Sequence, residues 1–200
     1  MDFLGISAEE LDKINSQGKK KTVEFTPVLE PVPDLSGYKE EVRQKYMLNR
    51  DAETLRLKHR HYNTNPQQVS NEKQLSANLP KIQRFIKRMK TLSDDSRDDI
   101  NNELQSLSLK SFISEVAHSL SENKLQLKDF PLLIEVCCNL HQKYPEFRKN
   151  FEMNLKKQHK EGDLLRKRNV LRFVAEMLAF GLWSDIPGFL KVIRDYVRAH

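Results

Sequence analysis

The chain has 200 residues, of which 38% are hydrophobic and 31% charged, and its formal net charge is +6. This composition excludes one evenly folded globule, which needs more apolar residues, and a wholly disordered chain, which has fewer. No stretch approaches the roughly 18–20 apolar residues of a membrane span, and Glu9, Glu10 and Asp12 interrupt any secretory signal. We therefore expect a soluble intracellular protein with no membrane partner.

The first third of the chain is predicted to lie outside the folded core. Glycine and proline recur through residues 1–36, which predicts a disordered tail. After Gly37 the sequence has no Gly or Pro up to about His61 and mixes charges of both signs, as in a solvated helix. Tyr62–Gln68 is interpreted as a loop, because Asn and Pro favour turns. Residues 37–74 are thus predicted to form a polar helix and a linker.

The apolar residues gather in residues 75–200, where their spacing predicts a series of helices. Ile82, Phe85 and Met89 follow each other at i, i+3 and i+7, on one face of a helix. By the same criterion, helices are predicted at 80–91, 96–107, 110–122, 129–143, 145–159 and 164–182, with a last helix from Ile186. Strict alternation of apolar and polar residues is missing, so the sequence predicts an all-α domain.

Short turns join these helices in antiparallel pairs: 80–91 with 96–107, 110–122 with 129–143, and 145–159 with 164–182. Pairs stacked in series form an α-solenoid, in which each pair buries its apolar face against its neighbours. A bundle of similar helices is the alternative, and the spacing of apolar residues does not separate the two.

The two C-terminal helices have well-marked apolar stripes. The stripe of 164–182 consists of Leu171, Val174, Ala175, Leu178 and Leu182, and that of the last helix of Ile186, Phe189, Leu190, Ile193 and Val197. The last helix has no downstream partner, so its stripe is expected to be exposed at the end of the stack. Either the chain is a fragment or this end docks onto another molecule; we favour the fragment.

The sequence contains no recognisable catalytic or metal-binding pattern. HExxH, GxGxxG, P-loop and GxSxG motifs are all missing, and the histidines in or beside the predicted helices, His118, His141 and His159, belong to no metal-binding motif. Cys137 and Cys138 lie in the apolar run of a helix, where a role in the core is favoured over a nucleophilic one. We expect no enzyme activity, no cofactor, no metal and no small-molecule substrate.

Two clusters of basic residues are candidates for contact with RNA or an acidic partner. The first consists of Lys81, Arg84, Lys87, Arg88 and Lys90, and the second of Lys156, Lys157, Lys160, Arg166, Lys167 and Arg168. Because the aromatic residues fall at inward positions, any RNA contact would be to phosphates, independent of base sequence and sensitive to salt. The alternative is that these residues only solvate exposed helix faces and turns.

Three long strings resemble the family of the middle domain of initiation factor four-gamma, a HEAT-like fold. They run from Lys81 to Asp95, from Ser106 to Phe147 and from Lys167 to Asp185. Within this family the strings are most similar to the first of three such domains in a factor of nonsense-mediated mRNA decay, apparently truncated. The resemblance implies that the family's fold-defining positions correspond to Leu107, Leu109, Ile113, Val116, Leu125, Val136, Leu140, Tyr144, Leu171, Phe173, Ala175 and Glu176. Because most of them are apolar, these positions are expected in the core.

The resemblance also implies a function. It indicates a scaffold or adaptor module of nonsense-mediated mRNA decay, acting through contacts with proteins of the mRNA surveillance complex and in the cytoplasm or near the nucleus. RNA is a further candidate partner, through its phosphates. The alternative is an RNA-binding helical-repeat module of a translation-initiation or splicing factor of the same fold family.

Overall fold

The regular secondary structure is helical throughout the computed structural model, which describes residues 25–64, 75–183 and 185–198. The described residues form eight α-helices: α2 (Glu40–Thr64), α3 (Leu79–Met89), α4 (Arg97–Ser106), α5 (Ile113–Ser121), α6 (Phe130–Lys143), α7 (Glu146–Glu161), α8 (Leu164–Ala179) and α9 (Ile186–Arg198). One-turn 3-10 helices lead into α4, α5 and α6 at Asp94–Ser96, Lys110–Phe112 and Leu127–Asp129. Within these residues the only β-type pairing is an isolated bridge between Ser76 and Leu107. The predicted all-α class is confirmed.

Side-chain caps mark where several helices begin. The side chain of Asn78 accepts the backbone N–H of Lys81 at 3.1 Å, which satisfies one of the free donors at the start of α3. Asp163 accepts the N–H of Arg166 at 2.7 Å and begins α8 in the same way. Pro131 occupies the first turn of α6, where its missing N–H costs little.

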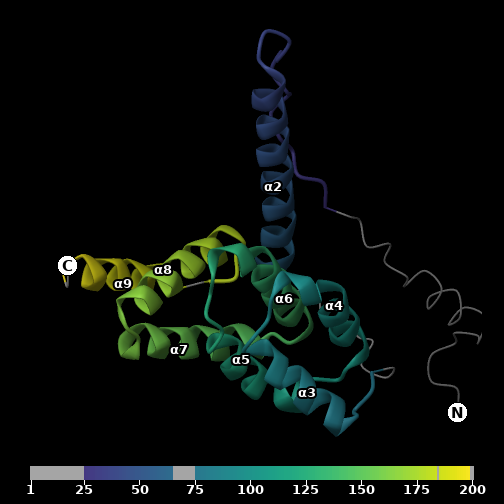
Figure 1. Ribbon diagram of the computed structural model, residues 1–200, viewed down its shortest axis with the longest axis vertical. Coiled ribbons are helices and arrows are strands. Elements are labelled where there is room, and N and C mark those ends of the chain that lie inside the picture. Colours follow the sequence, from purple (N-terminus) through teal and green to yellow (C-terminus); the bar gives the residue numbers. More distant parts are fainter. Residues whose placement is uncertain (1–24, 65–74, 184, 199–200) are drawn as a thin grey trace, which may run out of the picture.

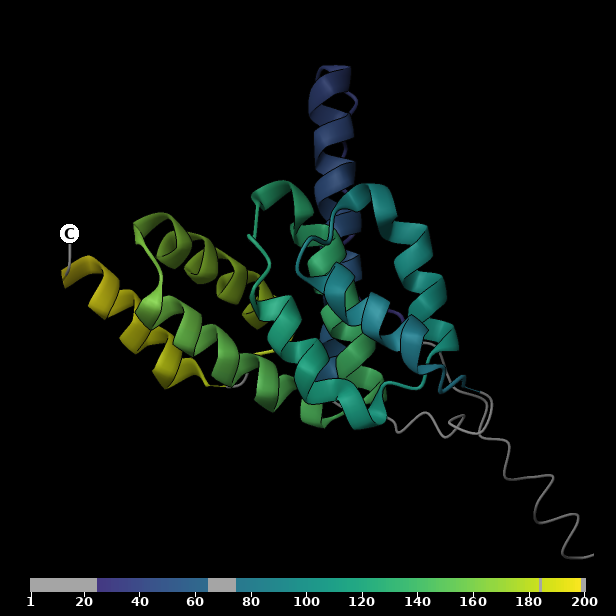
Figure 2. The ribbon, with the colours of Figure 1, turned by 60° about the horizontal axis from the view of Figure 1, so that its bottom comes forward.

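The helices form two layers, as expected of a solenoid (Figure 1). Helices α3, α5 and α7 pack side by side in one layer, and α4 and α8 flank α6 in the other. Figure 2 shows the same stack from another side, with α9 lying along its C-terminal end. The most extensive packing joins α5 to α7, two helices of the same layer, because neighbouring repeats bury their apolar faces against each other.

Large aromatic side chains fill the core of the stack. The rings of Phe147 and Phe151 stack with centroids 5.2 Å apart, and Phe173 of α8 meets Phe151 edge-on at 6.2 Å. Phe130 of α6 meets the same Phe173 ring at 5.1 Å. Three helices are thus joined by one set of aromatic contacts, which stabilise a fold beyond the burial of their area. The hydroxyl of Tyr144 accepts the backbone N–H of Leu109 at 3.0 Å.

The buried face of α8 differs from the prediction. Val170, Phe173, Val174 and Met177 are buried, whereas Leu171 is only half-buried and Ala175 is exposed. The helix carries apolar residues on two sides, and the side with the large Phe173 ring is the one that fills the space beside α6 and α7. Placing Leu171 and Ala175 in the core was therefore wrong, as was placing Glu176 there, since its side chain is 41% exposed.

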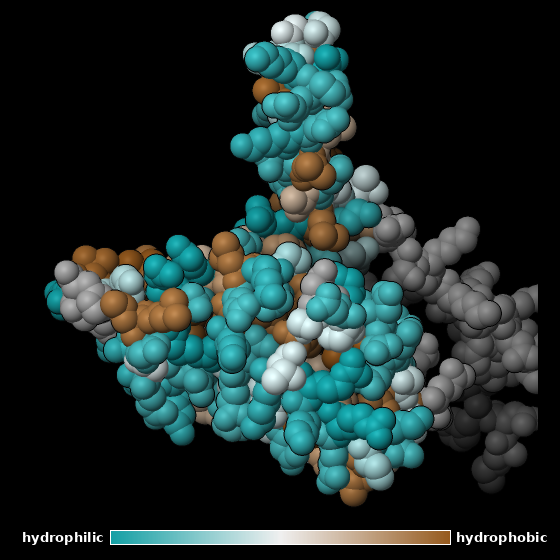
Figure 3. Space-filling view, in the orientation of Figure 1, coloured by the Kyte–Doolittle hydropathy of each residue, from teal (hydrophilic) through white to brown (hydrophobic). Residues whose placement is uncertain are grey.

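The last helix, α9, leaves much of its apolar stripe uncovered. Phe189 packs against the core, and Lys156 of α7 pairs with Asp185 just before the helix at 2.6 Å. Ile186, Leu190 and Val197 are 56%, 57% and 67% exposed. Hydrophobic surface is accordingly visible over α9 in Figure 3, as predicted for the end of the stack.

The polar helix α2 stands away from the two layers as an arm, and only its C-terminal part reaches them (Figure 1). We call α2 "the arm" and α3 to α8 "the body". Residues 25–36, the end of the predicted tail, have no regular structure and run beside the arm. Phe25 stacks on His61 with ring centroids 4.0 Å apart, and its N–H donates to the Tyr62 hydroxyl at 3.1 Å. The rest of that tail, residues 1–24, lies outside the described residues.

The arm ends later than predicted. It continues through Tyr62 to Thr64, although Tyr62–Gln68 was interpreted as a loop. The local preference of Asn for turns is overridden because Asn63 is buried against the body, where its side chain finds partners. The remainder of the predicted linker, residues 65–74, lies outside the described residues.

Candidate functional site

A buried asparagine fastens the arm to the body. Asn63 is 1% exposed, and its side-chain amide donates to the carbonyl of Phe180 at 2.8 Å. The same amide lies 3.3 Å from the sulfur of Cys138, while Gln142 donates to the Asn63 side-chain oxygen at 3.1 Å. The ring Nε2 of His141 lies 3.1 Å from the Asn63 backbone carbonyl. We call this set of contacts "the latch". Since it satisfies a buried polar side chain almost completely, it holds the arm in one orientation.

Two further contacts support the latch. Arg56 of the arm pairs with Glu176 of α8 at 3.5 Å, and its guanidinium lies 5.6 Å from the centre of the Phe180 ring. Gly181 has a φ of +72°, and a Cβ there would lie 3.1 Å from the side chain of Arg60. Glycine is favoured at this position because the backbone is left-handed and the arm passes close to it.

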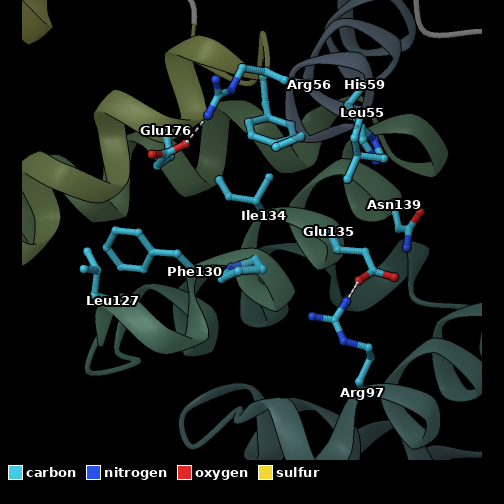
Figure 4. A pocket seen from close by; sticks show the side chains of 13 residues that line it. Leu55, Arg56, His59, Arg97, Leu127, Phe130, Ile134, Glu135, Asn139 and Glu176 are labelled. Atoms are coloured by element: carbon cyan, nitrogen blue, oxygen red, sulfur yellow. Dashed lines mark hydrogen bonds and ion pairs between the residues drawn. The ribbon is translucent and has the colours of Figure 1, made fainter. Parts of the chain in front are cut away.

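Arm and body enclose a groove of about 690 Å³ at their junction. It is lined by Ala52, Leu55, Arg56 and His59 of the arm, by Arg97 of α4, by Leu127, Phe130, Pro131, Ile134, Glu135 and Asn139 of α6 and the turn before it, and by Glu176 and Phe180 at the end of α8. Figure 4 shows Phe130 and Ile134 facing the groove between two ion pairs, and Figure 3 shows hydrophobic surface at the base of the arm. The groove combines an apolar floor with a charged rim, which is typical of a site that binds another molecule.

The charged residues on the rim of the groove form ion pairs with each other. Arg97 forms an ion pair with Glu135, and the Asn101 amide donates to the same carboxylate at 2.8 Å. At the other end, Arg56 and Glu176 form the pair already described. Burial lowers the pKa of His59, while the nearby Glu135 carboxylate partly raises it. The neutral form of His59 is therefore favoured on the groove wall.

The first predicted basic cluster is divided by the structure. Arg88 pairs with Glu103 at 3.1 Å and with Asp99 at 3.6 Å, and Lys90 pairs with Glu122 at 2.7 Å. These two residues join neighbouring helices. Lys81, Arg84 and Lys87 are exposed on α3. Their side chains form no ion pair within the part of the chain that the structure describes.

The second predicted cluster is divided in the same way. Arg166 donates to the backbone carbonyls of Ser121 and Asn123 at and just beyond the end of α5, and Lys156 pairs with Asp185 and lies 5.4 Å from the Trp183 ring. The other four residues form no ion pair among the described residues and lie around the α7–α8 turn: Lys157, Lys160, Lys167 and Arg168.

The described residues carry no constellation for metal chemistry: they contain no group of three or more His, Cys, Asp or Glu side chains placed to hold a metal ion. Cys137 and Cys138 are fully buried, as the core interpretation predicted. Burial raises the pKa of both thiols, that of Cys138 to about 12, so neither forms a reactive thiolate near neutral pH. In the same part of the chain, every helix is too short or too polar to cross a membrane.

Neither the latch nor the groove was predicted from sequence patterns. Asn63 lies in a polar segment, and its partners come from positions more than 70 residues further along the chain. The one local signal was Gly181 at the end of a helix, which is a usual position for a left-handed glycine. Nothing in the sequence indicates that this glycine faces the arm.

No family model matches the chain. Known proteins are nevertheless similar to it in sequence. The regulator of nonsense transcripts 2 of Homo sapiens is 30% identical over 132 residues, which are 62% of this chain and 10% of that protein. The regulator of nonsense transcripts UPF2 of Arabidopsis thaliana is 25% identical over 150 residues, 68% of this chain and 13% of that protein. The chain therefore spans about a tenth of the length of the relatives it matches.

A solved structure matches the described helices directly. The crystal structure of the first MIF4G domain of the human nonsense-mediated decay factor UPF2 superimposes with a TM-score of 0.70 at 26% sequence identity. The match covers 78% of this chain and 54% of that one. MIF4G denotes the middle-domain family that the sequence resembles. The chain thus has the MIF4G helical fold, and the regulators of nonsense transcripts 2 are its homologues.

Proposed function

We propose that the protein is a non-enzymatic scaffold module of nonsense-mediated mRNA decay. It acts in the cytoplasm, including the region around the nucleus, through contacts with protein partners of the surveillance machinery. The observation that carries the proposal is the similarity to two regulators of nonsense transcripts together with the match to a first MIF4G domain. The groove between arm and body, with its apolar floor and paired rim, is the surface we assign to protein contact.

The proposal is tested by the decay of a reporter messenger. Depletion of the protein from its own cells is expected to lengthen the half-life of a messenger with a premature stop codon several-fold. The half-life of the same messenger without that codon should not change. If both half-lives are unaffected, or both lengthen equally, the decay function is wrong.

Re-expression of variants in the depleted cells tests whether the groove is needed for decay. The variant Leu55→Asp with Leu127→Asp changes two residues that are 53% and 63% exposed, so it should fold normally. The matched control is Leu164→Asp, at a residue that is 49% exposed at the start of α8 and outside the groove. We expect the wild type and the control to restore decay, and the groove variant to fail at the same protein level.

We also propose that the module contacts RNA through phosphates. The residues that support this are the exposed or half-exposed members of the two basic clusters that form no ion pair within the described ranges: Lys81, Arg84, Lys87, Lys157, Lys160, Lys167 and Arg168. Each phosphate contact to a single strand contributes roughly −0.7 to the slope of log affinity against log salt. Replacing Lys157, Lys160 and Arg168 by Glu should therefore weaken binding to an oligouridine and flatten this slope. If the wild type does not bind the oligouridine detectably at low salt, the proposed RNA contact is wrong.

A further inference from the structure

The groove presents apolar side chains that nothing in the described chain covers. Leu55 on the arm and Leu127 before α6 are 53% and 63% exposed, and they lie on opposite walls of the groove. Phe130 and Ile134 form the floor between them. A groove of about 690 Å³ is large enough for several apolar side chains of one peptide segment.

Residues 2–14 combine apolar and acidic side chains, a composition that suits a groove with an apolar floor. Leu4, Ala8 and Leu11 follow each other at i, i+4 and i+7, which would place them on one face of a helix. Between Asp2 and Ile14 the acidic residues are Asp2, Glu9, Glu10 and Asp12, and the only basic one is Lys13. The arm, by contrast, has six Lys and Arg residues against four Asp and Glu. An acidic, apolar segment is thus complementary to the net charge of the arm as a whole. At the groove itself Arg56, the only Lys or Arg of the arm in the lining, is already paired with Glu176, so the apolar contacts provide most of the binding.

The position of Phe25 brings this segment within reach. Phe25 stacks on His61 and its N–H is bonded to Tyr62, so the chain enters the described part near the C-terminal end of the arm. Six residues of helix separate His61 from Leu55, a distance of about 9 Å along the axis. The ten residues from 15 to 24 can span up to roughly 33 Å when extended. Such a tether gives an effective concentration in the millimolar range, so that even a weak contact would be well populated.

We propose that residues 2–14 bind in the groove between arm and body of the same molecule. Leu4 and Leu11 meet the apolar floor, and the acidic residues lie toward the basic side chains of the arm. The segment then competes with any partner for the groove, which makes the N-terminus a regulator of that surface. This inference goes beyond the proposed decay function, and its test uses the purified chain alone, so either can fail without the other.

Cross-linking of the purified full-length chain tests the proposal. One cysteine is introduced into the segment as Ser7→Cys and one at the groove as Leu127→Cys. The native Cys137 and Cys138 are fully buried and have raised pKa values, so they do not react in the folded protein. A short bismaleimide should join the two introduced cysteines within one molecule about tenfold faster than in a control pair in which the second cysteine is Met153→Cys. Met153 is 62% exposed on α7, in the other layer.

Substitutions in the segment complete the test, because they leave every described residue unchanged. Leu4→Asp together with Leu11→Asp should slow the cross-linking of the cysteines at positions 7 and 127. The rate should fall to that of the control pair at positions 7 and 153. Ser16→Asp, outside the proposed contact, should not change it. Equal rates for the two original pairs would overturn the proposal. A cross-link formed only between two molecules would also overturn it, and would assign the groove to a second copy of the chain.

Discussion

The arm and the body are held in place by different kinds of interaction. The body is stabilised by a continuous apolar core, in which Phe85, Phe151 and Phe173 are fully buried. The arm buries only Asn63, and its attachment consists of the latch, one half-exposed ion pair and contacts with aromatic rings. Apolar burial contributes free energy in proportion to area, whereas a polar latch depends on a few directional bonds. The comparison predicts that the arm can be released while the body stays folded.

The largest effect is expected in the body. Phe151→Ala removes a ring that is packed against Phe147 and Phe173, and should lower the free energy of unfolding by about 3–5 kcal/mol. Thermal unfolding followed by circular dichroism should show a Tm lower by roughly 10 °C. Met153→Ala on the same helix, at a residue that is 62% exposed, is the control and should leave Tm nearly unchanged. A small effect of Phe151→Ala would mean that the aromatic contacts do not hold the stack together.

The next largest effect is expected at the latch. Asn63→Ala leaves the Phe180 carbonyl and the Gln142 side chain without a partner, which costs about 2–3 kcal/mol. Hydrogen exchange read by mass spectrometry should show faster exchange in peptides of α2 and unchanged exchange in peptides of α7. Asn102→Ala, at an exposed position of α4, serves as the control. If α2 and α7 lose protection together, the arm is not an independent unit and the comparison fails.

A smaller effect is expected where the body meets the arm. Gly181→Ala introduces a side chain at a φ of +72° and 3.1 Å from Arg60, and should cost about 1–2 kcal/mol. The loss of stability should again appear first as faster hydrogen exchange in peptides of α2. Gly37→Ala, where a Cβ meets nothing within 4 Å, is the matched control. Equal behaviour of the two variants would contradict the close approach of the arm at Gly181.

The smallest effect is a dependence of the latch on pH. His141 is 2% exposed, and its Nδ1 has no hydrogen-bond partner among the described residues. Burial lowers the pKa of His141, so the folded protein binds fewer protons than the unfolded chain, whose histidine titrates near 6.5. Stability is therefore fully present above about pH 6.5 and decreases as the pH falls below it. Exchange in α2 should accelerate between pH 7.5 and 5.5, after correction for the intrinsic rate.

A substitution shows whether this pH dependence belongs to the latch. His141→Gln keeps a hydrogen-bond donor at the position and removes the titrating ring. The difference between the exchange rates of α2 at pH 7.5 and at pH 5.5 should therefore shrink. His118→Gln, at a side chain that is 57% exposed, should leave the difference as it is in the wild type. An unchanged pH dependence in the His141 variant would assign the effect to other groups, with His59 the first candidate because burial lowers its pKa as well.

The helices of the body could be predicted because their signals are local. Apolar residues recur at helical spacing, and Pro131 and Gly162 mark helix boundaries, so type and approximate limits of each helix follow from neighbouring residues. The buried face of α8 was less predictable. Leu171 and Phe173 lie on different sides of the helix and are both apolar, and only the shape of the space beside α7 selects the ring.

The sequence by itself determined the all-helical class, the order of the helices, the burial of both cysteines and the polar character of the arm. These properties depend on composition and on spacing within a few turns. The tertiary structure alone decided that Asn63 is buried, that Arg88, Lys90, Lys156 and Arg166 connect helices, and that a groove exists at the base of the arm. Each of these depends on residues that are distant in the chain, and a lysine or an asparagine has the same local pattern whether or not folding brings it a partner.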